Sequence, residues 1–206
     1  MIQQFITIGE PHVHTPPRGF ALWALGFRPF YLLASVFAAL SIALWAMQFA
    51  SWPGTAYLQG PAWHAHEMVF GFTLAVVTGF LFTAGRNWTG QPTPTGLRLA
   101  LLAMLWLTGR VLVLTPWSWA AAIVNVGFTL SVAAALARPL LASRNRRNYF
   151  FIGLLVGMAT AQLAFHLVQL GVQQWPAWVG LQLGLDVLLL IIAVMTGRVL
   201  PMFTNN

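Results

Sequence analysis

The chain has 206 residues, of which 59% are hydrophobic and only 6% are charged. This composition excludes an ordinary soluble domain and indicates an integral membrane protein. The formal charge of +7 comes from ten arginines against Glu10, Glu67 and Asp186, with no lysine. Because the arginines fall between apolar segments, membrane topology explains them better than nucleic-acid binding does. Cysteine is absent, which excludes disulfides, thiolate metal sites, iron–sulfur clusters and covalently attached c-type haem.

Residues 1–24 are mixed in character and contain prolines, without the ordered features of a cleaved signal peptide. We therefore expect an N-terminal cytoplasmic arm over 1–24. His12 and His14 lie in this arm. They can be interpreted as a metal-binding pair, but an isolated pair of histidines is more commonly a solvated segment.

Six apolar segments follow, and each is close to the ~20 residues that a bilayer-spanning helix needs. We place them near 25–49, 67–85, 97–114, 117–137, 149–172 and 178–199. Since the links between them are short, consecutive helices should be antiparallel neighbours. The sequence thus predicts an all-α integral membrane protein, with one domain of about six transmembrane helices over 25–206.

The arginines orient this predicted bundle. They precede the first segment, flank the links 2–3 and 4–5, and end the sixth segment, whereas the other links carry none. The positive-inside rule then predicts a cytoplasmic N-terminus. Arg110, inside the third segment, is the exception, and an intramembrane arginine is costly enough to suggest a functional site. Its side chain can snorkel to the outer interface, or pair with a carboxylate or a propionate.

The densest chemistry is the run Trp63-His64-Ala65-His66-Glu67-Met68, at the start of the second segment. Small residues follow at every fourth position and form a stripe that lets another helix approach closely. The members of this stripe are Gly71, Ala75, Gly79 and Thr83. His64 and His66 are two positions apart, so on a helix they point to opposite sides and cannot share one centre.

Two further ionisable groups lie at a similar depth. By helix rise, His166 is roughly 9 Å short of the outer end of the fifth segment and Asp186 about 12 Å inside the sixth. His166 belongs to a polar stripe with Gln162, Gln169 and Gln173. Histidines on facing bundle helices commonly hold haem or a metal. The candidate ligands are His64, His66 and His166, and the candidate second-layer, propionate or proton partners are Glu67, Arg110 and Asp186.

Each of these residues also has a simpler interpretation. His166 can be a hydrogen-bonded structural histidine, and Asp186 can merely neutralise Arg110. His64 and His66 can be solvated residues at the membrane interface. The joint placement of all these groups in the outer half of the bundle favours a site.

The residues from Trp63 to Ala84, together with Asn87-Trp88-Thr89-Gly90, resemble the NnrS family. Gly26-Phe27-Arg28-Pro29-Phe30 and the run from Gly197 to Asn205 are similar to it too. The resemblance implies a multi-pass protein of the bacterial inner membrane that binds non-covalent haem and copper. It also implies a small gas ligand such as nitric oxide, and a role in denitrification or in resistance to nitrosative stress. Members of the family are longer, so the chain resembles their first half.

Two functions from different classes follow. The first is a haem- and copper-binding membrane protein of nitric oxide metabolism, in which His64 and His66 are the family's motif histidines. The second is a non-redox channel, carrier or assembly factor that uses the intramembrane polar cluster. A channel should carry polar residues through both leaflets, whereas here they become sparse toward the cytoplasmic side, which favours the first function. We expect no nucleic-acid partner, and homo-oligomer formation and enzymatic activity stay open.

Overall fold

A computed structural model describes residues 21–51 and 54–204, and within these ranges the chain is helical with no strand. The helical elements are η1 (Ala21–Ala24), α1 (Phe27–Phe49), α2 (Gly60–His66), η2 (Glu67–Thr73), α3 (Leu74–Thr89), α4 (Gly96–Leu112), α5 (Ser118–Ala142), η3 (Arg146–Asn148), α6 (Phe150–Gln169) and α7 (Trp178–Thr204). The predicted all-α membrane fold is confirmed. Of the predicted arm, only η1 lies in the described residues, and His12 and His14 lie outside them.

The elements α2, η2 and α3 form one continuous helix of 30 residues, so the described chain folds into six long helices. Five of these are long and apolar enough to cross a membrane, while α4 is shorter, with 17 residues. The second helix begins at Gly60, earlier than predicted, because Pro61 occupies its first turn, where proline's missing N–H costs nothing.

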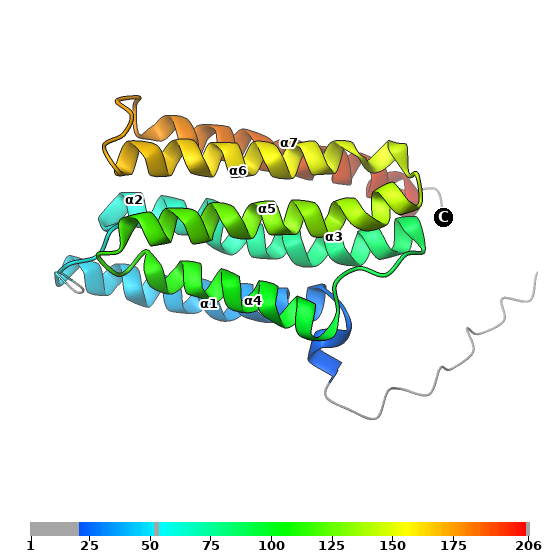
Figure 1. Cartoon of the computed structure of the whole chain (residues 1–206), viewed down its shortest axis with the longest axis horizontal. Helices are drawn as coiled ribbons and strands as arrows, with labels where there is room; N and C mark the ends of the chain where they lie inside the picture. The colour runs from blue at the N-terminus through cyan, green and yellow to red at the C-terminus, as the bar shows by residue number, and fades with distance from the viewer. Residues whose placement is uncertain (1–20, 52–53, 205–206) are drawn as a thin grey trace, which may run out of the picture.

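Figure 1 shows the six helices running side by side in three layers. One outer layer contains α1 and α4, the middle layer α3 and α5, and the other outer layer α6 and α7. Contacts join α3 to α1, α5 to both α3 and α4, and α6 to both α5 and α7. The middle layer therefore positions the side chains of all the others.

The small-residue stripe of the second helix receives α1, as predicted. A Cβ atom at Gly79 would lie 3.0 Å from the Tyr31 ring and 3.1 Å from the Cβ of Phe30. One turn farther on, the Thr83 hydroxyl accepts a hydrogen bond of 3.3 Å from the Phe27 backbone N–H. The absence of bulk on this face brings the backbones of α1 and α3 close together.

The two ends of the bundle differ in composition. One end contains the links 90–95 and 143–149 and the C-terminal end of α7 (Figure 1). We call it the arginine-rich end, because its links and flanking turns contain Arg86, Arg98, Arg138, Arg144, Arg146, Arg147 and Arg198. The opposite end, where α2 begins, we call the histidine end. The side of the membrane that each end faces stays a prediction.

Candidate functional site

A π-helical segment interrupts the second helix at its most polar point. This segment, η2, spans Glu67–Thr73 and starts directly after His66. Its wider turn is stabilised by the Thr73 hydroxyl, which donates to the Met68 carbonyl five residues earlier at 2.7 Å. Long π-helical runs are rare and frequently occur at functional sites. Two consecutive polar residues where this segment begins, His66 and Glu67, are both fully buried.

The rings of His66 on α2 and His166 on α6 lie close together at the histidine end. Their ring centroids are 5.0 Å apart, with 61° between the ring planes. Both side chains are fully buried, and neither Nε2 atom has a hydrogen-bond partner. A buried polar group without a partner costs about 1–3 kcal/mol, so a pair of such atoms requires an explanation.

The other nitrogen of each ring has a partner that fixes the tautomer. His66 Nδ1 lies 2.8 Å from Glu67 Oε1, and a carboxylate paired with an arginine accepts the proton of Nδ1–H. The Tyr57 hydroxyl donates to the His166 backbone carbonyl at 3.4 Å and lies 3.2 Å from His166 Nδ1, whose proton its oxygen can accept. In this arrangement both Nε2 atoms carry an unprotonated lone pair.

Tyr57 lies in the link between α1 and α2, and burial raises the pKa of its phenol above the ordinary value. The hydroxyl therefore stays protonated over the whole neutral range and keeps its hydrogen-bonding role. Nothing in the sequence indicated this residue, because a single tyrosine in a link has no periodic pattern.

Arg110 of α4 forms a buried ion pair with Glu67. Its Nη1 lies 2.8 Å from Glu67 Oε2, and its Nη2 donates to the side-chain oxygen of Asn125 on α5. The guanidinium also lies over the Trp106 ring, 5.5 Å from its centroid. With an exposed fraction of 7%, Arg110 does not snorkel to the interface. The carboxylate it needs comes from the π-helical segment.

Asp186 is not part of this cluster, and the carboxylate that pairs with Arg110 is Glu67, so the interpretation that Asp186 neutralises Arg110 does not hold. It lies on an exposed face of α7 and accepts a hydrogen bond of 2.8 Å from Gln182. His64 is separated from His66, as the spacing of two predicted. Its ring stacks on Trp45 of α1, with centroids 4.0 Å apart and an angle of 9° between the planes.

The structure thus joins two of the three predicted histidines with two of their three predicted partners. Within residues 21–51 and 54–204, no group of three or more His, Asp or Glu side chains has a metal-binding arrangement. The chemical unit is therefore a pair of imidazoles, with Glu67 and Tyr57 as orienting groups and Arg110 behind Glu67.

An apolar groove reaches this unit from the lipid-facing surface. It has a volume of about 410 Å³ and lies between α1 and α4, where Phe37, Leu40 and Leu44 form part of its walls. Trp106 and Arg110 also line it. The groove therefore leads from the apolar surface to the back of the buried ion pair.

The sequence profile of a family described as NnrS protein matches residues 21–206. No curated protein and no solved structure matches the chain. The family match includes every helix described above and covers the π-helical segment together with both buried histidines. The chain therefore belongs to the NnrS family, which makes it a membrane protein linked to the nitric oxide response.

Proposed function

We propose that this chain binds copper between His66 and His166 and acts through it in nitric oxide metabolism or resistance to nitrosative stress. The observation that carries the proposal is a pair of buried Nε2 atoms that have no hydrogen-bond partner and belong to rings whose centroids lie 5.0 Å apart. A bare imidazole nitrogen is the form of histidine that ligates a metal. A bound ion would remove the cost of two unsatisfied polar atoms at once.

The residues present fit a copper ion. Imidazole ligands suit copper, and metal-ligating histidines almost always donate their second N–H to a carboxylate, carbonyl or similar acceptor. Glu67 and Tyr57 are such acceptors for His66 and His166. Two imidazoles leave coordination positions open for a small ligand.

A haem fits the same residues less well. The rings of Phe70 and Phe165 pack against His66, with centroid distances of 5.4 Å and 5.2 Å. A porphyrin ligated by His66 would have to displace these rings, whereas a single ion between the imidazoles would not. Haem, which the family resemblance implies, stays a prediction that the spectrum described below tests.

When bound, copper would supply a redox-active centre with a position open to a gas. The protein's own contribution is mainly electrostatic. Arg110 offsets the charge of the Glu67 carboxylate in an apolar interior, and Glu67 accepts the hydrogen bond that orients His66 Nδ1. Phe70 and Phe165 exclude water from the two Nε2 atoms. A small uncharged gas can enter the apolar groove between α1 and α4 as far as Trp106 and Arg110, whereas an ion would lose its hydration there.

The test is metal analysis of the purified chain in mild detergent after incubation with copper, with a reduced-minus-oxidised absorption spectrum of the same sample. We expect about one copper per chain, lost in both His66→Ala and His166→Ala. His64→Ala is the matched control and should keep the copper, because its ring stacks on Trp45. Unchanged copper in the first two variants would refute the site.

The spectrum separates the remaining possibilities. A Soret band with stoichiometric iron, lost in His66→Ala, would mean that this site holds haem and not copper. A well-folded chain that takes up neither copper nor haem would favour the non-redox channel, carrier or assembly factor. His64 as a ligand and Asp186 as a propionate or proton partner stay predictions from the sequence.

We further propose a bacterial inner-membrane location with the arginine-rich end in the cytoplasm and a cytoplasmic arm over 1–24, ahead of one domain over 25–206. The positive charge around the links 90–95 and 143–149 supports this orientation. A reporter fused within 143–149 should read out in the cytoplasm, and a periplasmic signal would reverse the orientation.

A further inference from the structure

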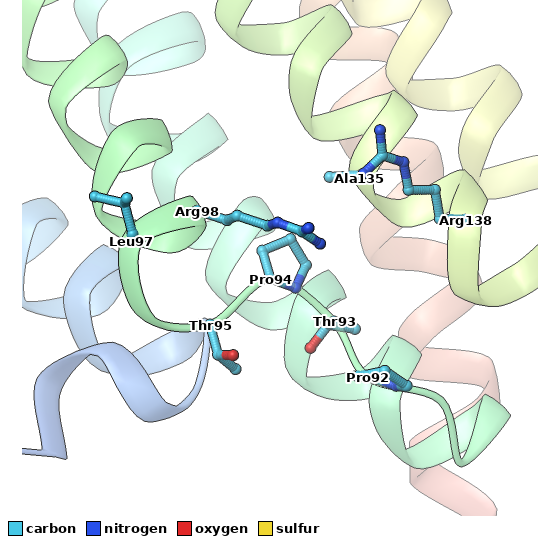
Figure 2. Close-up of a pocket in the computed structure, with 8 residues that line it drawn as sticks. All are labelled: Pro92, Thr93, Pro94, Thr95, Leu97, Arg98, Ala135 and Arg138. Atoms are coloured by element: carbon cyan, nitrogen blue, oxygen red, sulfur yellow. The ribbon is translucent and has the colours of Figure 1, made fainter.

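The arginine-rich end contains a cavity that the metal site does not use. It has a volume of about 460 Å³ and lies between the first turn of α4 and the last turns of α5. Figure 2 shows Arg98 of α4 and Arg138 of α5 extending from opposite sides above the stretch 92–95. Two permanent positive charges therefore border one space.

No carboxylate of the described chain neutralises these two arginines. Glu67 is paired with Arg110, and Asp186 is bonded to Gln182. The ion pair between Glu67 and Arg110 lies at the histidine end, and no other pair of a carboxylate with an arginine occurs among the described residues. Two cations bordering a shared cavity repel each other, so an anion between them would be stabilised by both.

The cavity also offers uncharged donors. The Thr93 side chain, 5% exposed, lines it, and its hydroxyl has no hydrogen-bond partner. The 17-residue helix α4 begins there, and the Thr95 side chain does not cap it. The first backbone N–H groups of a helix are unsatisfied and attract anions, phosphate above all. Arginine adds charge-assisted, bidentate hydrogen bonds to phosphate.

A second cavity, of about 470 Å³, continues from the first one along the α4–α5 interface. The two cavities share Pro94, Arg98, Ala135 and Arg138. The added lining is mostly apolar and includes Leu101, Leu102, Leu105 and Ala134. A phosphate pocket that continues into an apolar groove on a membrane-spanning protein matches a phosphate carrying an acyl chain better than a free anion.

We propose that an anionic phospholipid binds here. Its phosphate accepts hydrogen bonds from Arg98, Arg138, the Thr93 hydroxyl and the first turn of α4, and one acyl chain lies in the groove between α4 and α5. If the arginine-rich end is cytoplasmic, the site faces the leaflet surface whose negative potential attracts basic segments.

Native mass spectrometry of the delipidated full chain tests the proposal, with phosphatidylglycerol titrated against phosphatidylcholine. We expect preference for phosphatidylglycerol, and a loss of at least about tenfold in its affinity in Arg98→Gln/Arg138→Gln, since each basic group near an anionic headgroup contributes about a factor of five. Arg144→Gln/Arg146→Gln is the control, because it removes two charges from the same end outside the cavity. If both double variants lose the same affinity for phosphatidylglycerol, the lipid responds to the general positive charge of this end and the specific site is refuted.

A second pair of variants tests the groove and distinguishes lipid from free phosphate. Ala134→Trp should fill the groove and weaken phosphatidylglycerol, whereas Leu189→Trp on an exposed face of α7 should not. Glycerol phosphate should compete only weakly with the lipid. If it binds as tightly as phosphatidylglycerol, or if Ala134→Trp has no effect, the occupant is a free phosphate and the lipid proposal is wrong. Arg98→Lys, which keeps the charge but loses the planar fork, replaces the double variant if that variant does not fold.

Discussion

Charged side chains at the two ends of the bundle differ in their partners. At the histidine end, Glu67 and Arg110 are buried and find each other and Asn125 inside the protein. At the arginine-rich end, Arg198 lies over the rings of Trp88, Phe150 and Phe151 and bonds to Asn148. Arg98 and Arg138, in contrast, border an open cavity.

The difference follows from dehydration. A charge in an apolar interior must be paired internally, because an isolated ion there costs far more than a hydrogen bond returns. A charge at the membrane surface can take its partner from water or from a lipid headgroup. At the histidine end the charged groups are therefore paired within the protein before any ligand binds. At the arginine-rich end, Arg98 and Arg138 take their partners from water or lipid.

Breaking the internal pairing should produce the largest effect. Arg110→Leu leaves the Glu67 carboxylate buried without its cation, and removing one partner of a buried pair typically costs about 3–5 kcal/mol. The free energy of unfolding, measured by denaturant titration in detergent, should fall by that amount. The double variant Glu67→Gln/Arg110→Leu should recover a large part of the loss, since no charge is left unpaired.

Additive losses in Glu67→Gln and Arg110→Leu would contradict the pair. The same cycle has a second readout at the metal site. Glu67→Gln keeps a hydrogen-bond acceptor near His66 Nδ1 but removes the charge, so the copper affinity of the folded fraction should fall in addition to the stability lost by leaving Arg110 unpaired. Mutating a group that hydrogen-bonds to a metal ligand typically lowers the metal affinity by about 10–100-fold.

A methyl group placed against the ion pair should have the next largest effect. A Cβ atom at Gly71 would collide with the Arg110 guanidinium and would lie 2.9 Å from Glu67 Oε2 and 3.2 Å from the Phe37 ring. We expect Gly71→Ala to destabilise the chain by about 1–3 kcal/mol, as overpacking does. Gly153→Ala on α6 meets nothing within 4 Å and should stabilise its helix by about 0.5–1 kcal/mol. Equal effects at the two positions would remove the steric argument.

The contrast between the ends also explains what the sequence could predict. Hydropathy identifies six apolar segments well, because the bilayer sets their length. Helix rise then gives the depth of each polar side chain, which correctly placed His66, His166, Glu67 and Arg110 at one level. Depth does not specify rotation about the helix axis, so the sequence leaves a pairing of Asp186 with Arg110 open, whereas Asp186 lies on an exposed face of α7.

Two further features had no sequence signal. The π-helical turn at Glu67–Thr73 shifts the register of the second helix, and the single glycine in that run, Gly71, does not distinguish a π-helical turn from an ordinary helix. Tyr57 reaches His166 from a link, where neither periodicity nor depth can be counted. Both features depend on tertiary packing around the histidines, and this is why the details of the site required the structure.

Removing the hydroxyl of Tyr57 should have a moderate effect. Tyr57→Phe leaves His166 Nδ1 without its acceptor, so we expect weaker copper binding by about tenfold with little change in stability at neutral pH.

The same variant should change how stability depends on alkaline pH. Burial raises the pKa of the Tyr57 phenol, so the folded chain keeps the phenol proton at a pH where the unfolded chain, with a phenol pKa of about 10, has lost it. Tyr57 therefore makes the chain less stable as pH rises above about 10, and Tyr57→Phe should reduce that alkaline loss in a denaturant titration. If the free energy of unfolding depends on alkaline pH equally in both proteins, the Tyr57 phenol is exposed to water and the prediction is wrong.

The smallest effect should come from Asp186, the one predicted partner that the structure moves away from the site. Asp186→Asn keeps a side chain that Gln182 can bond to, and the position is exposed. We expect the free energy of unfolding to change by less than about 0.5 kcal/mol, as for most surface substitutions. The informative measurement is the double variant with Arg110→Leu. Because Arg110 is paired with Glu67 on the other side of the middle layer, the two losses should add within about 0.5 kcal/mol. A coupling well above that value would mean that the carboxylate of α7 reaches Arg110 after all, and that the two groups share one charge network.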